Sequence, residues 1–309
     1  MRKAATYLVL SVVGLGMLFP LLWQLSTSLK PAADVFAGVD DPVKALVPHE
    51  ARPENYARVY RATRSMGGGF ARWYFNSIVV AVVVTLGQVT TSACAAYAFA
   101  RLRFPGRDKL FLSYLGTMMI PGAVTMIPNF ILMRKIPEWL ATVAPGVDWL
   151  QLREVILLGH LFDAGRLLGL DSYFVLIVPV MFSAYGTFML RQFFMSIPRD
   201  LEEAATIDGC GLLQIFTKII LPLSKPGLAT LAVFTFMGNW QSFYWPLIML
   251  SEDSMKTLPL GLLTFMGLHS TQWELLMAGS LMMILPLIIV FVLGQKWFIS
   301  GIQLGALKG

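Results

Sequence analysis

Six long stretches free of Asp, Glu, Lys and Arg constrain the fold of this chain more than any other feature. A charge at the centre of a membrane-spanning helix costs about 2.5–3.5 kcal/mol on the insertion scale, so such stretches mark spans. Each is near or above the roughly 18–20 residues that a helix needs to cross a bilayer. The sequence therefore predicts an all-α, polytopic membrane protein: a single domain over residues 1–309, with six transmembrane helices at about residues 4–29, 73–100, 110–133, 172–194, 226–250 and 275–297.

Composition agrees with a membrane protein. Hydrophobic residues make up 56% of the chain, charged residues 14%, and the mean hydropathy is +0.67. These values exclude an ordinary soluble domain. Two cysteines, Cys94 in a span and Cys210 in a polar loop, cannot build a disulfide framework, and we interpret both as structural.

The distribution of basic residues predicts the orientation. With the N-terminus inside, the short inner segments hold twelve basic and five acidic residues, whereas the outer loops hold twelve and thirteen. The positive-inside rule favours this arrangement, with both termini cytoplasmic. The pI near 9.4 then reflects topology and not a nucleic-acid partner. The predicted loops are cytoplasmic at residues 195–225 and extracytoplasmic at 30–72, 134–171 and 251–274.

Glycine and proline recur at mid-depth in the predicted spans. Broken helices are tolerated there only where neighbouring groups or a cavity satisfy the freed backbone. These residues could therefore mark kinked helices packed around a transport pathway, or ordinary kinks in helix packing, and both interpretations stay as alternatives. The residues are Pro121, Gly122, Pro128, Pro179, Gly186, Gly238, Pro246 and Pro286.

The polar loop between the fourth and fifth spans predicts two short helices. Asp200 is a good N-cap and Glu203 completes a capping box, while Gly209 is placed to end the first helix. A second helical run, from Leu212 to Leu221, should stop before Pro222. Such a helical pair suits a docking plug for a soluble partner, and a capped hairpin without a partner is the alternative.

The spacing of fixed residues in this loop resembles the EAA loop of the membrane subunits of ATP-binding-cassette (ABC) importers. The run Glu-Ala-Ala begins at Glu203, and Gly209 follows it after three intervening residues. Nine residues separate Gly209 from Ile219, and one residue separates Ile219 from the Leu-Pro pair that ends at Pro222. The resemblance implies that an ATPase docks on Glu203, Ala204, Ala205, Asp208, Gly209, Ile219, Leu221 and Pro222.

Other segments resemble carbohydrate-importer permeases of the maltose type, over about four-fifths of the chain. They are Phe19–Lys30, Asn76-Ser77, Ala95–Phe111, the run from Met118, Leu190–Pro198 and the tail Gln295–Gly309. The resemblance implies the ABC type I importer permease fold in the bacterial cytoplasmic (inner) membrane, and import of a sugar or oligosaccharide by alternating access.

The resemblance also implies the partners. They are a second homologous permease, two cytoplasmic ABC ATPase subunits, an extracytoplasmic solute-binding protein and the lipid bilayer. The chain lacks a Gly-rich phosphate loop and the common hydrolase motifs, so we expect a transport subunit and not an enzyme. We expect it to bind no cofactor or metal, with ATP and Mg on the ATPase subunits.

Polar and aromatic residues inside the spans are candidates for the pathway, because sugars hydrogen-bond to amides and stack on aromatic rings. Interhelical hydrogen bonding is the alternative for each. The main candidates are Asn239, Trp240, Gln241 and Tyr244, and the wider set adds Gln24, Ser26, Gln88, Thr91, Asn129 and Tyr185. Gln241 stands where the family usually has asparagine.

Three further segments carry expectations. The loop Glu252, Asp253, Ser254 and Met255 should reach the binding protein, and Gln303, Gly305, Lys308 and Gly309 should form a flexible strand that contacts the ATPases. Residues 137–166 should form an extracytoplasmic helical hairpin, either a lid or docking surface or a neutral insertion.

Other functions remain as alternatives. Within the importer class, the solute could be a polyol or a glycerol phosphate. An ion-coupled secondary transporter is disfavoured because the six apolar stretches contain no Asp, Glu, Lys or Arg for proton coupling. A membrane-embedded enzyme is disfavoured further because no catalytic motif is present.

Overall fold

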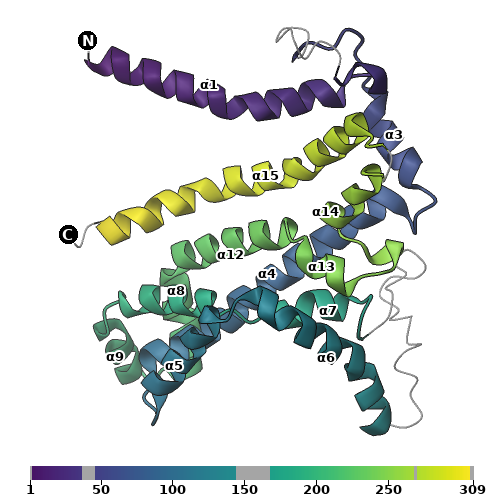
Figure 1. Cartoon of the computed structure of the whole chain (residues 1–309). Helices are drawn as coiled ribbons and strands as arrows, with labels where there is room; N and C mark the ends of the chain where they lie inside the picture. The colour runs from purple at the N-terminus through teal and green to yellow at the C-terminus, as the bar shows by residue number, and fades with distance from the viewer. Residues whose placement is uncertain (1, 37–45, 144–167, 268–269, 307–309) are drawn as a thin grey trace. The chain divides into compact units, whose positions relative to one another are not determined.

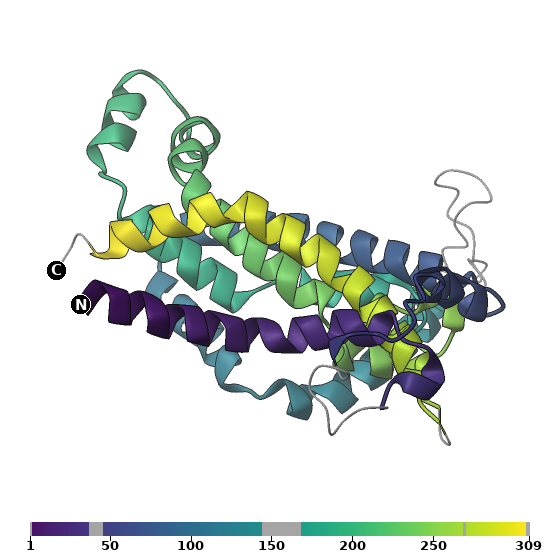
Figure 2. The same ribbon diagram turned by 90° about the horizontal axis from the view of Figure 1, so that it is seen from above.

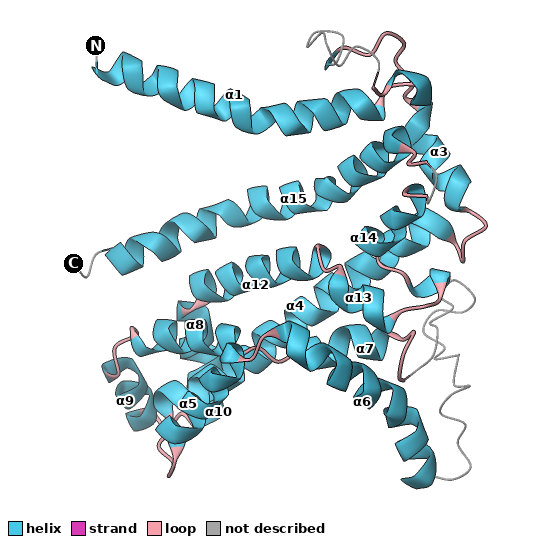
Figure 3. Cartoon of the chain, viewed as in Figure 1, coloured by secondary structure: helices cyan, strands magenta, loops and turns pink. Residues whose placement is uncertain are grey.

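The computed structural model describes residues 2–36, 46–143, 168–267 and 270–306, and every named element in this part is helical (Figures 1 and 3). An isolated bridge between Met266 and Thr271 is the sole β pairing among these residues. The predicted all-α class is confirmed. The chain divides into two compact units, Met1–Tyr74 with Lys256–Pro286 and Phe75–Met255 with Leu287–Gly309, which are described separately.

The first unit carries a long helix whose apolar surface is bare. No residue in the apolar window of α1 (Arg2–Ser28) is buried, so this surface belongs in lipid or against another subunit. The other elements of the unit are η1 (Ala32–Asp34), α3 (Glu54–Thr63), the start of α4 (Gly69–Arg101), α14 (Leu258–Gly261), η6 (Leu262–Phe265) and the first part of α15 (Trp273–Ala306).

Buried polar contacts hold the first unit together. The Asn55 amide donates to the backbone oxygens of Ser28 and Lys30, each at 2.9 Å, and so satisfies carbonyls at the end of α1. The buried carboxylate of Glu274 pairs with Arg58 at 3.7 Å. A partner is needed because an unpaired buried charge is strongly unfavourable.

The second unit contains the loop region and most of the predicted spans. Its core joins the C-terminal part of α4 to α8 and to the polar loop. Its elements after α4 are α5 (Arg107–Gly116), η2 (Thr117–Met119), α6 (Gly122–Val143), α7 (Tyr173–Ile177), η3 (Val178–Val180), α8 (Ala184–Met195), α9 (Asp200–Ile207), α10 (Leu212–Ile215), the π-helical η4 (Phe216–Ile220), α11 (Leu221–Leu223), α12 (Lys225–Trp240), α13 (Tyr244–Met249), η5 (Asp253–Met255) and the end of α15.

Four segments are long and apolar enough to cross a membrane singly, and two bent pairs bring the number to as many as six among the described residues. The four are Thr6–Ser28, Gly69–Arg101, Tyr173–Met195 and Trp273–Gln295. The pair Arg107–Met119 and Gly122–Val143 bends by 96°, at the Pro121-Gly122 step where the sequence predicts a kink. The second bend, of 76°, lies between Leu223 and Lys225, at the edge of the polar loop.

A break within the fourth predicted span has its backbone groups satisfied by α4. Helical hydrogen bonding is interrupted between η3 and α8, and the Gln88 amide donates to the Val180 oxygen at 3.2 Å. The Thr91 hydroxyl donates to the Met181 oxygen at 2.6 Å. For Gln88 and Thr91, the structure therefore supports the interhelical alternative over a pathway role.

Of the predicted 137–166 hairpin, only residues 137–143 are described, as the end of α6. The remainder lies outside the described residues.

Candidate functional site

The polar loop lies at the same end of the second unit as the C-terminal end of α4 and the start of α5 (Figure 3). It runs through α9, α10, η4 and α11, and in Figure 2 it extends beyond α8 and α12, the helices that it connects. The helical pair predicted from the sequence is confirmed. The start of its first helix and the end of its second helical run differ from the prediction.

The capping box predicted at Asp200 and Glu203 is wrong. Asp200 is the first helical residue of α9, and Arg199 before it already has helical backbone angles. The Glu202 and Glu203 amides donate to the Arg199 oxygen at 2.9 and 3.0 Å, so the turn starts one residue earlier than expected. The Asp200 side chain is then inside the helix and caps nothing.

The predicted end of α9 at Gly209 is confirmed. Gly209 has a φ of +82°, which favours glycine, and its amide donates to the Thr206 oxygen at 3.0 Å. The Cys210 amide donates to the Ala205 oxygen at 2.9 Å. Together these bonds form a Schellman ending, which reverses the chain toward α10.

The second run does not stop before Pro222. It passes through the π-helical turn η4 and continues as α11 to Leu223. Pro222 lies inside this continuous run, directly after the π-helical turn, where i→i−5 hydrogen bonding changes back to α-helical bonding.

The loop has two different faces. Ala205, Ile215 and Ile220 are buried in the core with residues of α4 and α8. Among the predicted docking residues, Ile219 and Leu221 pack partly against that core, while Glu203, Ala204, Asp208, Gly209 and Pro222 are exposed. Large apolar side chains are exposed beside them, namely Leu201, Ile207, Leu212 and Leu213. Exposed apolar groups next to carboxylates are typical of a protein-binding surface.

Arg101, which the sequence did not single out, fixes the loop to the helices behind it. Its side chain is only 4% exposed and forms an ion pair with Glu202 at 2.8 Å. The same guanidinium donates to the oxygens of Phe194, in the last turn of α8, and Ile197, two residues after it, at 2.6 and 2.7 Å. It thereby supplies donors to carbonyls at a helix end, where few intrahelical donors remain. A lone arginine at the end of a span carries no pattern that would have revealed this role.

The C-terminal tail is helical and not a flexible strand. The helix α15 runs to Ala306, so it includes Gln303 and Gly305, while Lys308 and Gly309 lie outside the described residues. Because α15 is already formed before these residues, extending it needs no new helix nucleus, and single glycines, each unfavourable by roughly 1 kcal/mol relative to alanine, do not end it.

The four main pathway candidates lie around a further helix break, between α12 and α13. Asn239 and Trp240 end α12, Gln241 follows them, and Tyr244 starts α13. Gln241 and Tyr244 are exposed, whereas Trp240 is buried and stacks on Phe236 with ring centroids 5.8 Å apart. The Asn239 amide donates to the Thr235 oxygen of its own helix at 2.8 Å. Contact of these residues with a solute stays a prediction.

Buried side chains hold the loop Glu252–Met255, which is predicted to contact a binding protein. The buried Asp171 carboxylate accepts from the Ser251 and Glu252 amides at 2.5 and 2.8 Å. The Asn76 amide donates to the Ser254 oxygen at 2.9 Å. Met255 is completely buried, so only the part from Glu252 to Ser254 can be presented to a partner.

Multiple apolar helices with breaks, and a polar helical loop with an exposed face, define a multi-span membrane protein with a protein-binding surface. Comparison with known proteins agrees. Residues 94–303 match the family model described as "Binding-protein-dependent transport system inner membrane component".

Curated relatives match over almost the full length. The arabinooligosaccharides transport system permease protein AraQ of Bacillus subtilis is 31% identical, covering 99% of this chain and 96% of the relative. The sn-glycerol-3-phosphate transport system permease protein UgpE of Yersinia enterocolitica is 33% identical, covering 95% and 94%. A chain of a bacterial ABC transporter involved in the import of the acidic polysaccharide alginate is 24% identical, with a TM-score of 0.74 and 96% coverage of both chains.

The chain therefore belongs to the family of inner membrane components of binding-protein-dependent transport systems. It has the type I importer permease fold. It is a multi-pass transport subunit of an ABC importer and not an enzyme, and the ATPase is a separate subunit. A role as an ion-coupled secondary transporter is thereby excluded.

Proposed function

We propose that this chain is the permease subunit of an ABC importer that moves a sugar or oligosaccharide across the bacterial cytoplasmic membrane by alternating access. The full-length similarity to an arabinooligosaccharide permease supports this substrate class. The similar match to a glycerol-phosphate permease makes a glycerol phosphate the second candidate.

The observation that carries the proposal is the two-faced loop from α9 to α11. Its buried side is continuous with the core of α4 and α8, and its exposed side presents carboxylates and large apolar groups. A movement imposed on the exposed side would be passed to the spans, because the buried side is packed and ion-paired to them. This is the arrangement that a mechanical joint to an ATPase needs.

The proposed assembly places two cytoplasmic ATPase subunits, which bind ATP and Mg, against the loops of this permease and of a second homologous permease. An extracytoplasmic solute-binding protein delivers the solute near Glu252, Asp253 and Ser254. The last turn of α15, with Gln303 and Gly305, and the residues Lys308 and Gly309 supply a second, weaker contact to the ATPases.

Replacement of Glu203 by Lys tests the docking face. Glu203 is exposed on the first turn of α9, where the helix dipole favours an anion, and it has no role in the core. We expect the variant to reach the membrane but to lose most ATPase co-purification and solute-stimulated ATP hydrolysis, by about tenfold or more, because interface charge reversals cost several kcal/mol.

Glu54→Lys is the matched control. Glu54 is likewise exposed on the first turn of a helix, α3, in a loop predicted to be extracytoplasmic. The Glu54→Lys substitution should destabilise its helix by the same unfavourable dipole interaction as Glu203→Lys does, and it should leave ATPase binding unchanged. Normal ATPase binding by Glu203→Lys would show that the loop does not dock through this residue.

The solute is tested by uptake into proteoliposomes that hold the complete importer and its own binding protein. Arabino-oligosaccharide and sn-glycerol 3-phosphate are compared at equal concentrations. Preferred uptake of glycerol phosphate would replace the sugar proposal and leave the importer class unchanged.

A further inference from the structure

A pocket with an excess of positive charge lies between the α4–α5 turn and the start of α9. Its volume is about 610 Å³, within the usual range for small-molecule sites. All of its lining residues belong to the second unit. They are Arg103, Phe104, Gly106, Arg107, Asp108, Lys109 and Arg199.

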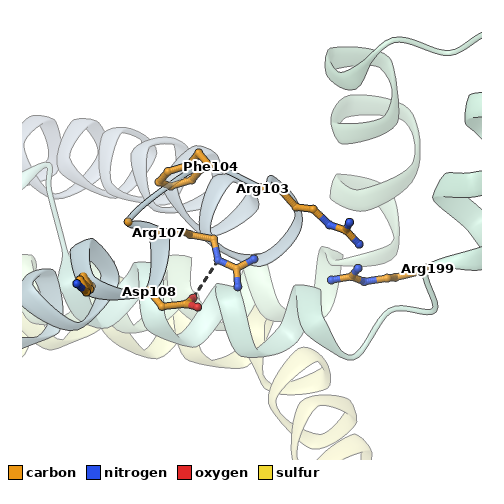
Figure 4. Close-up of a pocket in the computed structure, with 7 residues that line it drawn as sticks. Arg103, Phe104, Arg107, Asp108 and Arg199 are labelled. Atoms are coloured by element: carbon orange, nitrogen blue, oxygen red, sulfur yellow. Dashed lines mark hydrogen bonds and ion pairs between the residues drawn. The ribbon is translucent and has the colours of Figure 1, made fainter.

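Two guanidinium groups face each other in this pocket. Figure 4 shows Arg103 from the α4–α5 turn and Arg199 from the start of α9 pointing toward one another. Neither side chain has an ion pair or hydrogen bond to any residue that the structure describes. Two cations held face to face without a counter-charge repel, and an anion between them would remove the repulsion.

The single carboxylate in the pocket does not neutralise this pair. Asp108 is bound to its neighbour Arg107, with 2.9 Å between the carboxylate oxygen and Nε (Figure 4). Arg103, Arg199 and Lys109 therefore keep their positive charge available. Gly106, with a φ of +79°, makes the tight turn that brings Arg103 and Arg107 to one side.

An apolar surface starts where the pocket ends. Phe104 is part of the lining, and the exposed leucines Leu110 and Leu112 follow Lys109 along α5. Lys109 immediately precedes the predicted span at residues 110–133, so the pocket lies at the depth of lipid headgroups. The exposed apolar residues of the docking loop, such as Ile207 and Leu213, are not in the lining.

We propose that this pocket binds the phosphodiester headgroup of an anionic phospholipid of the inner leaflet. Arg103 and Arg199 hold the phosphate between them, Lys109 adds charge, and the acyl chains lie along Leu110 and Leu112 of α5. Arginine suits this role because its planar fork binds phosphate oxygens in pairs. Basic pockets at the cytoplasmic ends of spans are known to attract such headgroups. The site is independent of the solute pathway.

The test uses the complete importer, stripped of lipid in neutral detergent and then titrated with phosphatidylglycerol or phosphatidylcholine, with retained lipid counted by native mass spectrometry. The test variant combines Arg103→Gln and Arg199→Gln. We expect it to lower phosphatidylglycerol retention by about tenfold or more, because each basic group near an anionic surface contributes about a factor of five. Retention of phosphatidylcholine should not change.

The matched control combines Arg134→Gln and Lys135→Gln. It removes the same two charges from exposed positions of α6, in a loop predicted to be extracytoplasmic. Its phosphatidylglycerol retention should equal that of the unmodified importer. If the Gln pair fails to fold, Arg103→Lys with Arg199→Lys keeps the charge and should retain phosphatidylglycerol better than phosphatidylcholine.

Three results would overturn the proposal. Equal loss in the test and control variants would show a general charge effect. Full displacement of phosphatidylglycerol by millimolar inorganic phosphate would show a site for a soluble anion. Loss of ATPase co-purification with unchanged lipid retention would show that the pocket faces the ATPase.

Discussion

At the scale of single residues, Arg101 joins the polar loop to the helices behind it. Its guanidinium donates to the Phe194 oxygen of α8 and to the Ile197 oxygen just after that helix, and it pairs with Glu202 of α9. We expect Arg101→Gln to destabilise the protein by about 3–5 kcal/mol, because it leaves buried groups unpaired. Arg52→Gln, which breaks an exposed pair with Glu50, should cost about 0–1 kcal/mol. Unfolding in detergent measures both, and similar costs would show that Arg101 is not a structural joint.

At the scale of elements, the helix breaks and the 251–255 loop depend on side chains from elsewhere in the second unit. Asp171→Ala would leave the Ser251 and Glu252 amides without their acceptor, at a cost of about 1–3 kcal/mol. We expect a lower unfolding temperature and weaker stimulation of the importer by its binding protein. Glu138→Ala, at an exposed carboxylate of α6, should keep the unfolding temperature unchanged. An Asp171→Ala variant with normal stability and normal stimulation would contradict the anchoring role.

At the scale of the whole molecule, the orientation across the membrane remains a prediction from loop charge. It is tested with single cysteines in a variant that lacks Cys94 and Cys210. We expect a cysteine at Ala57 of α3 to react with a membrane-impermeant maleimide on spheroplasts, whose outer membrane has been removed, because loop 30–72 is predicted outside. A cysteine at Ile207, exposed on α9, should react only after the spheroplasts are opened. The reverse pattern would invert the topology and remove the basis for cytoplasmic docking.

Sequence alone determines the features that depend on local chemistry or on sums along the chain. The all-α class follows from long charge-free stretches, the break at Pro121-Gly122 from proline sterics, and the end of α9 from the glycine at position 209. The spacing from Glu203 to Pro222 also indicated the importer family to which the comparisons assign the chain. These features can be predicted without knowing which residues distant in the sequence are in contact.

Tertiary structure alone decided which polar residues have partners. Gln88 and Thr91, which the sequence offers as pathway candidates, donate hydrogen bonds to the freed carbonyls of Val180 and Met181. The role of Arg101 depends on residues more than ninety positions away. The pocket exists because the fold brings Arg199 opposite Arg103. Each of these outcomes depends on long-range packing, which a pattern read along the chain does not contain.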